Sequence, residues 1–137
     1  MRRDFSVFQE VFIMNEKIFT ENAPAAIGPY SQAICVGDMI FTSGQIPINP
    51  ATGDVEAVTI EEQTEQVCKN LSAVLEAAGA SLENAVKTTC FLQDMADFAK
   101  FNEVYAKYFT GKPARSCVAV KALPKGGLVE VECIASK

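Results

Sequence analysis

The segment from residue 59 to residue 79 constrains the fold more than any other stretch, because its apolar residues recur at helical spacing. The charged residues fall away from that stripe, so one face of the predicted helix packs and the other meets water. Thr59 with Glu62 three residues later is a capping-box pattern, and Gly79 stands where a left-handed C-terminal cap is expected. The stripe comprises Ile60, Thr64, Val67, Leu71, Val74, Leu75 and Ala78.

A second helix is predicted by an aromatic stripe at spacings of three and four residues. Asp97 is the expected N-cap, and Gly111 and Pro113 end the segment. A stripe of this kind is typical of core packing rather than of ligand stacking. Its members are Phe98, Phe101, Val104, Tyr105, Tyr108 and Phe109.

Short apolar runs on either side of the helices predict strands. Two of them flank Gly37-Asp38, which is a hairpin signal, whereas "IPINPATGD" is expected to be a connecting loop rather than a strand. The last two runs flank "LPKGG" and are expected to pair as a second hairpin. The predicted strands cover residues 17–20, 32–36, 39–43, 85–94, 115–121 and 128–135.

The resulting order is three strands, a helix, a strand, a helix and two strands. Two helices cannot cover both faces of such a sheet, so we expect an α+β two-layer sandwich with a mixed sheet of about six strands and both helices on one face. The length of 137 residues suits one domain, which we assign to residues 14–137. Residues 1–13 are an N-terminal extension: an upstream start, or an added strand or helix.

Composition excludes several classes of function. Lys and Arg total 12 against 17 Asp and Glu, and no basic cluster forms, so binding to nucleic acid is not favoured. No apolar run approaches the roughly 20 residues of a membrane-spanning helix. Five widely spaced cysteines without a CxxC pair indicate reduced thiols in a cytoplasmic protein rather than disulfides or a zinc site. Histidine is absent, so any chemistry uses carboxylate, arginine, tyrosine, thiol, backbone or water.

Alternation along the last two strands predicts which face each side chain occupies. Ser116, Val118 and Val120 share a face, as do Val129, Val131, Cys133 and Ala135, and we expect these faces to meet the helices. The other face then carries a mixture too apolar for water and too charged for a core, so a homo-oligomer would bury it. Arg115 and a glutamate there form either a structural ion pair or a subunit-boundary pocket with an anion anchor and an acid–base group. That face comprises Arg115, Cys117, Ala119, Lys121, Leu128, Glu130, Glu132 and Ile134.

Several separated blocks carry a family resemblance that runs from about Lys17 to the C-terminus. They are "ENAPAAIGPYSQA", "SGQIPINPATG", "EAAG", "VKTTCFLQDMADFAKFNEVYAKYF", "PARSCVAV" and "LPKGGLVEVECIA". In this order they resemble the reactive intermediate deaminase family, RidA or YjgF, also known as L-PSP endoribonucleases. The resemblance implies a chorismate-mutase-like fold and a homotrimer with three ligand pockets between subunits.

The resemblance also implies the site residues. Arg115 of "PARS" would bind a ligand carboxylate through its guanidinium fork, and Glu130 of "VEVE" would be the second catalytic group. Cys117 would contribute mainly its backbone. Further pocket positions match Tyr30, Ser43, Gly44, Phe98 and Asn102.

These last five residues have structural alternatives. In those alternatives the two aromatic residues only pack in the core, and Ser43 caps a turn. Gly44 then serves backbone geometry alone, and Asn102 is an exposed helix residue. Cys117 lacks a histidine partner and is expected to be a small wall residue rather than a nucleophile. The sequence departs from the family pattern in a short "TGK" connection before "PARS" and in residues 1–13.

The activity implied by the resemblance is hydrolysis of short 2-imino acids, such as 2-iminobutanoate and 2-iminopropanoate, to 2-keto acids and ammonium. Arg115 would orient the substrate, and Glu130 would position water and move the proton. The reaction needs no metal and no organic cofactor. A non-catalytic keto-acid-binding or chaperone-like trimer is the first alternative, and an endoribonuclease or translation inhibitor is the second.

Overall fold

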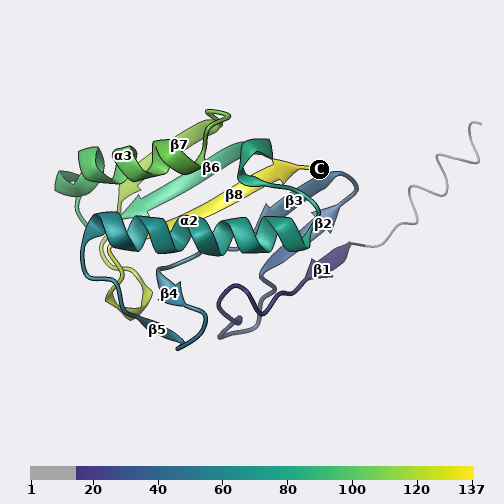
Figure 1. Ribbon diagram of the computed structural model, residues 1–137, viewed down its shortest axis with the longest axis horizontal. Coiled ribbons are helices and arrows are strands. Elements are labelled where there is room, and N and C mark those ends of the chain that lie inside the picture. Colours follow the sequence, from purple (N-terminus) through teal and green to yellow (C-terminus); the bar gives the residue numbers. More distant parts are fainter. Residues whose placement is uncertain (1–14) are drawn as a thin grey trace, which may run out of the picture.

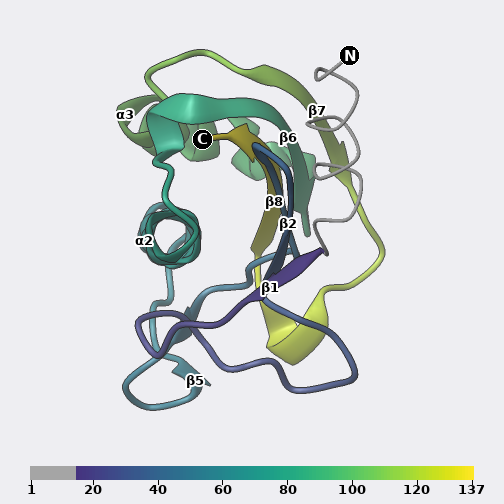
Figure 2. The same cartoon turned by 90° about the vertical axis from the view of Figure 1, so that its right-hand side faces the viewer.

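The computed structural model describes residues 15–137, so the predicted extension over residues 1–13 lies outside the described residues. Six strands form one sheet in the order β1-β2-β3-β8-β6-β7, and both long helices cover the same face of it (Figures 1 and 2). The predicted α+β architecture is therefore confirmed. The sheet consists of β1 (Glu16–Ile18), β2 (Ala33–Val36), β3 (Met39–Thr42), β6 (Ala85–Leu92), β7 (Ala114–Ala119) and β8 (Val129–Ser136).

Helix α2 (Ile60–Ala77) begins and ends as its sequence predicts. Thr59 Oγ1 accepts a hydrogen bond from Glu62 N at 3.1 Å. The Glu62 carboxylate accepts one from Thr59 N in turn, which completes the capping box. Gly79 has a φ of +89°, a left-handed conformation that glycine adopts without strain. The predicted stripe is buried against the sheet, so this helix supplies much of the core.

The second helix, α3 (Phe98–Tyr108), forms as predicted but is capped differently. Asp97 makes no side-chain capping hydrogen bond, because a 3₁₀ turn over Met95–Asp97 runs directly into the helix and holds Asp97 at a helical φ of −87°. An N-cap needs an extended backbone. Asp94 has that conformation and accepts a hydrogen bond from Ala96 N at 2.9 Å.

The connection after β3 is not purely a loop. Within "IPINPATGD" and the residue that follows it, β4 (Ile48–Asn49) pairs with β5 (Asp54–Val55) as a small separate hairpin. The turn between them places Gly53 at a φ of +81°. The prediction of a connector without strand pairing is therefore wrong, because a turn with a left-handed glycine lets the chain fold back on itself.

The last two strands do not form the predicted hairpin. β6 lies between β7 and β8, pairing parallel with β7 and antiparallel with β8. The physical reason is the crossover through α3: a helix packed on one face returns the chain beside β6 in the same direction. The chain from β7 to β8, which includes a 3₁₀ turn over Pro124–Gly126, then passes to the far side of β6. β7 is consequently an edge strand.

The same pairing corrects the predicted face of β7. Thr88 and Cys90 of β6 are buried under the helices, and their register partners in β7 are Arg115 and Cys117. Arg115 and Cys117 therefore lie on the helix-covered face, whereas Val118 is 47% exposed on the open face. The predicted faces of β8 are confirmed, with Val129, Val131, Cys133 and Ala135 all buried in the core.

Three buried amide side chains link the helices and strands to their connecting loops. Asn70 of α2 donates from Nδ2 to the carbonyl oxygens of Ile46 and Ile48, at 3.2 and 2.9 Å, and accepts from Gln66 Nε2. The two other amides with such hydrogen bonds are those of Gln32 and Gln63. None of the helices within residues 15–137 is long and apolar enough to cross a membrane.

We expect Asn70→Ala to lower the free energy of unfolding by about 1–3 kcal/mol, because two buried carbonyl groups lose their donor. Urea unfolding followed by circular dichroism measures this change. Ser72→Ala on the same helix is the matched control, since its hydroxyl makes an exposed hydrogen bond to Glu76. Equal stabilities of the two variants would show that Asn70 does not hold the 46–48 segment.

Candidate functional site

Arg115 lies on the helix-covered face of edge strand β7, beneath α3. Its Nη1 donates to Asn102 Oδ1 at 2.7 Å. Its Cζ lies 4.8 Å from the centre of the Tyr105 ring, 5.5 Å from that of Phe98 and 5.9 Å from that of Phe101. One face of α3 thus supplies both an amide acceptor and an aromatic cradle, and cation–π attraction stabilises the guanidinium there.

The charge of this guanidinium is not balanced from within the helix-covered layer. Among residues 15–137 its one hydrogen-bond partner is the neutral amide of Asn102, although a guanidinium has five donors. Glu130 and Glu132 lie on the opposite face of the sheet, so an ion pair between either of them and Arg115 cannot form within one chain. An arginine held in place with free donors is suited to bind an anion, and a carboxylate matches its fork.

Cys117 follows Arg115 on the same face and is partly buried. Burial raises the pKa of its thiol, and the neighbouring Arg115 offsets that shift only in part. The thiol is therefore protonated near neutral pH. A protonated thiol is a poor nucleophile.

A cavity of about 470 Å³ opens on the other side of the sheet and gathers four of the predicted residues. Tyr30 and Ser43 come from the segments before β2 and after β3, while Glu130 projects from the open face of β8. Tyr30 OH accepts a hydrogen bond from Ile27 N, and Ser43 Oγ donates to the Ser31 carbonyl oxygen at 2.6 Å. The lining residues are Ile27, Tyr30, Ser43, Gly44, Ile46, Pro124, Glu130 and Glu132.

Glu130 has a perturbed carboxyl group in this cavity. Burial raises the pKa of its carboxyl group, and the negative charge of Glu132 raises it further. Glu132 was placed on the right face by strand alternation but was not among the predicted site residues. The period-two spacing within "VEVE" is the signal that could have identified it. Ile27, Ile46 and Pro124 have no comparable signal.

Gly44 permits the close approach of Glu130. A Cβ atom at this position would collide with Glu130 Oε2 and lie 2.9 Å from its Cδ. Its role is therefore steric, since a side chain here would occupy the space of the carboxylate. This refines the prediction for Gly44, which named backbone geometry as the alternative.

The predicted site residues thus form two groups on opposite faces of the sheet. Arg115, Cys117, Phe98 and Asn102 belong to the helix-covered group, and Tyr30, Ser43, Gly44 and Glu130 line the open-face cavity. The structure does not bring the two groups together within one chain. The sequence prediction of one shared face is wrong because β7 pairs with β6 rather than with β8.

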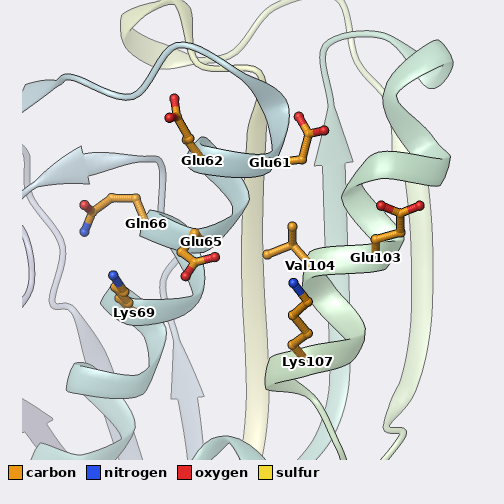
Figure 3. Close-up of a pocket in the computed structure, with 8 residues that line it drawn as sticks. All are labelled: Glu61, Glu62, Glu65, Gln66, Lys69, Glu103, Val104 and Lys107. Carbon is orange, nitrogen blue, oxygen red and sulfur yellow. The ribbon is translucent and has the colours of Figure 1, made fainter.

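A further hollow of about 390 Å³ lies between α2 and α3 on the outer surface and contains none of the predicted residues (Figure 3). Four glutamates and two lysines surround it, a pattern typical of solvated helix faces. Glu65 there accepts a hydrogen bond from Tyr108 OH at 2.9 Å. We do not assign it to the site. Its lining residues are Glu61, Glu62, Glu65, Gln66, Lys69, Glu103, Val104 and Lys107.

The fold and the two residue groups define an α+β protein with an arginine that keeps hydrogen-bond donors free and a half-buried carboxyl group. The model of the family described as Endoribonuclease L-PSP matches residues 20–137, and the chain belongs to this family. The predicted membership of the RidA/YjgF family is thereby confirmed.

Individual relatives extend over nearly the whole chain. A RutC family protein of Pyrococcus horikoshii is 58% identical over 125 residues, which cover 90% of this chain and 99% of that protein. The 2-iminobutanoate/2-iminopropanoate deaminase of Escherichia coli K12 is 51% identical over 126 residues, covering 89% and 98%. The crystal structure of E. coli TdcF with bound serine matches with a TM-score of 0.85 at 43% identity, covering 89% and 98%.

We expect Gly44→Ala to displace the Glu130 side chain rather than the backbone, because the colliding carboxylate ends a flexible side chain. A crystal structure of the variant should show Glu130 in another rotamer, with the free energy of unfolding changed by less than about 1 kcal/mol. In the double variant Gly44→Ala with Glu130→Ala, the segment around residue 44 should keep its position. A Glu130 carboxylate that stays in place in the single variant would contradict this role for Gly44.

Proposed function

We propose that this protein hydrolyses short 2-imino acids to 2-keto acids and ammonium. The observation that carries the proposal is the Arg115 guanidinium, which is held by a neutral amide and three aromatic rings and keeps donors free for a carboxylate. A relative named for this activity is 51% identical over nearly the whole chain. The serine bound by TdcF has an α-carboxylate, as the proposed substrates do.

The complete site is proposed to form between two copies of the chain. Arg115 and Glu130 lie on opposite faces of one sheet, so a single copy cannot direct both at one small substrate. The open face also exposes large apolar side chains, with Ile27 at 65%, Phe41 at 43% and Val118 at 47%. Apolar surface of this kind marks an interface. A closed homotrimer would cover it and create three equivalent clefts.

In the proposed reaction Arg115 binds the substrate carboxylate and thereby fixes the position of the C=N bond. Water adds to the imine carbon while Glu130 accepts its proton. Glu130 then delivers that proton to the nitrogen, which completes the carbinolamine. The hydroxyl proton of the carbinolamine passes to the same nitrogen through Glu130, and the C–N bond breaks as the carbonyl forms. Nitrogen leaves as ammonia, which is protonated to ammonium. Acid–base help of this kind contributes on the order of 10²–10⁴ in rate.

The raised pKa of Glu130 suits this role. A group that must accept a proton and then return it works best when its pKa approaches the working pH. Burial and Glu132 shift the Glu130 pKa in that direction. The reaction requires no metal and no organic cofactor, because water is the only co-reactant.

The first test measures imine hydrolysis by the purified protein, with RNA cleavage assayed in parallel. An imine-producing dehydratase supplies the substrate, and release of keto acid is followed spectroscopically. Hydrolysis without RNA cleavage supports the proposal. RNA cleavage without hydrolysis would favour the endoribonuclease alternative, and keto-acid binding without either activity would favour a binding protein.

We expect Arg115→Lys and Glu130→Gln each to lose nearly all hydrolysis, and mixed oligomers of the two to regain activity. Lysine keeps the charge without the fork, and the amide cannot carry the proton. If one copy supplies Arg115 and its neighbour supplies Glu130, every closed trimer that contains both variants keeps one of its sites intact, about a third of the total. Co-expression with two affinity tags isolates the mixed oligomers, whose turnover is then measured.

Oligomers that mix Arg115→Lys with the double variant Arg115→Lys/Glu130→Gln are the matched control, because they contain no arginine at position 115. They should stay inactive. An inactive mixture of the two single variants, with wild-type oligomeric state, would contradict a site shared between copies.

A pH profile tests the role of Glu130. The carboxylate is the form that accepts a proton, so activity rises as the pH increases through the Glu130 pKa, which lies above the ordinary carboxyl value. Glu132→Gln removes the neighbouring negative charge and lowers that pKa, so the acid limb of kcat/KM should move to lower pH. Glu61→Gln, on the outer hollow, removes one charge elsewhere and should leave the limb in place. An unmoved limb in Glu132→Gln would contradict the assignment.

A further inference from the structure

A buried pair of hydroxyl groups lies directly beside Arg115. Thr88 of β6 is the register partner of Arg115, and its side chain is fully buried on the same face. The Thr88 Oγ1 and Tyr105 OH atoms are 2.6 Å apart, a short hydrogen bond in which either hydroxyl is able to donate. The Tyr105 ring is the aromatic ring nearest to the guanidinium among those of α3 that surround it. The pair therefore connects strand β6 to the aromatic ring against which the Arg115 guanidinium lies.

The Tyr105 ring is fixed on its other sides as well. It stacks on Phe109, with ring centres 4.4 Å apart, and meets Phe101 at 5.4 Å, so its neighbours one turn away along α3 hold it on both sides. Burial raises the pKa of its hydroxyl to about 12, so the ring stays a neutral phenol at working pH. A neutral ring attracts the guanidinium through its face without neutralising its charge.

We propose that Tyr105 is a positioning residue for Arg115, and that the Thr88 hydroxyl fixes the angle at which its ring supports the guanidinium. Asn102 then holds one nitrogen of the guanidinium and the ring holds its plane, so the free donors face the substrate. This inference rests on the proposed function, because it assumes that Arg115 binds the substrate carboxylate. A guanidinium held in advance has less freedom to lose when the carboxylate binds.

Four variants separate the ring from the hydroxyl pair. Tyr105→Leu removes the ring, Tyr105→Phe removes only its hydroxyl, Thr88→Val replaces the partner hydroxyl with a methyl group, and Thr88→Ser keeps that hydroxyl. Isothermal titration with 2-oxobutanoate measures binding, and steady-state kinetics separates KM from kcat. All measurements are made well below the melting temperature of each variant.

We expect Tyr105→Leu to weaken 2-oxobutanoate binding about tenfold, which lies between the scales of an exposed and a desolvated cation–π contact. Tyr105→Phe and Thr88→Val should each weaken binding about threefold, with KM raised and kcat within about twofold of wild type. The double variant Tyr105→Phe/Thr88→Val should bind no more weakly than either single variant, because both changes break one hydrogen bond. Thr88→Ser should bind like the wild type.

Tyr108→Phe is the matched control for loss of a hydroxyl. It makes the same chemical change on the same helix, but its hydroxyl bonds to Glu65 in the outer hollow of Figure 3. It should leave 2-oxobutanoate binding and KM unchanged. A role in stability alone would lower the melting temperatures of the Tyr105 and Thr88 variants and leave their affinities at the wild-type value.

Arg115→Ala distinguishes failure of this inference from failure of the proposed function. If Arg115→Ala loses 2-oxobutanoate binding while Tyr105→Leu and Thr88→Val bind like the wild type, the positioning role is overturned and the carboxylate anchor stands. If Arg115→Ala binds like the wild type, both the proposed anchor and the positioning role are overturned. Additive effects of Tyr105→Phe and Thr88→Val would overturn the coupling through the hydroxyl pair.

Discussion

The parallel pairing of β7 with β6 is the constraint on which the arrangement of the site depends. Its register sets Arg115 beside Thr88 and Cys117 beside Cys90. Both β7 side chains therefore lie on the helix-covered face, as their partners in β6 do. The antiparallel register of β8 on the other side of β6 places Glu130 opposite Phe91, on the open face. A shift of either register by one residue would exchange the faces and bring a different set of side chains beneath α3.

Buried amides give the surrounding loops a fixed geometry. Gln32 accepts from Thr20 N at 2.7 Å and donates to the Pro24 carbonyl oxygen at 2.8 Å, while Gln63 donates to Ala57 and accepts from Leu128 N. Each amide satisfies backbone groups that a loop cannot pair within itself. Together with Asn70 they hold the segments before β2, after β3 and before β8, and these segments supply the wall of the open-face cavity.

The environments of Arg115 and Glu130 suit the proposed chemistry in a chain without histidine. Aromatic rings and a neutral amide surround the cation, so its charge is available to an anion. Burial and a second carboxylate raise the pKa of Glu130 toward the range where a carboxyl group exchanges protons easily. The proposed reaction needs both conditions at one substrate, and the sheet separates them within a single chain.

Local interactions made the helices and the first hairpin predictable from sequence. The capping box at Thr59, the left-handed Gly79 and the turn at Gly37 each depend on residues only a few positions apart, and the structure contains all three. The family blocks indicated the candidate site residues, but no local pattern distinguishes a β7 paired with β8 from a β7 paired with β6. Only the tertiary structure decided that Arg115 lies beneath α3 and Glu130 on the opposite face. The partner of β7 is selected by the crossover helix, which must pack on the sheet. That packing is an interaction between residues far apart in sequence, so no local pattern encodes it.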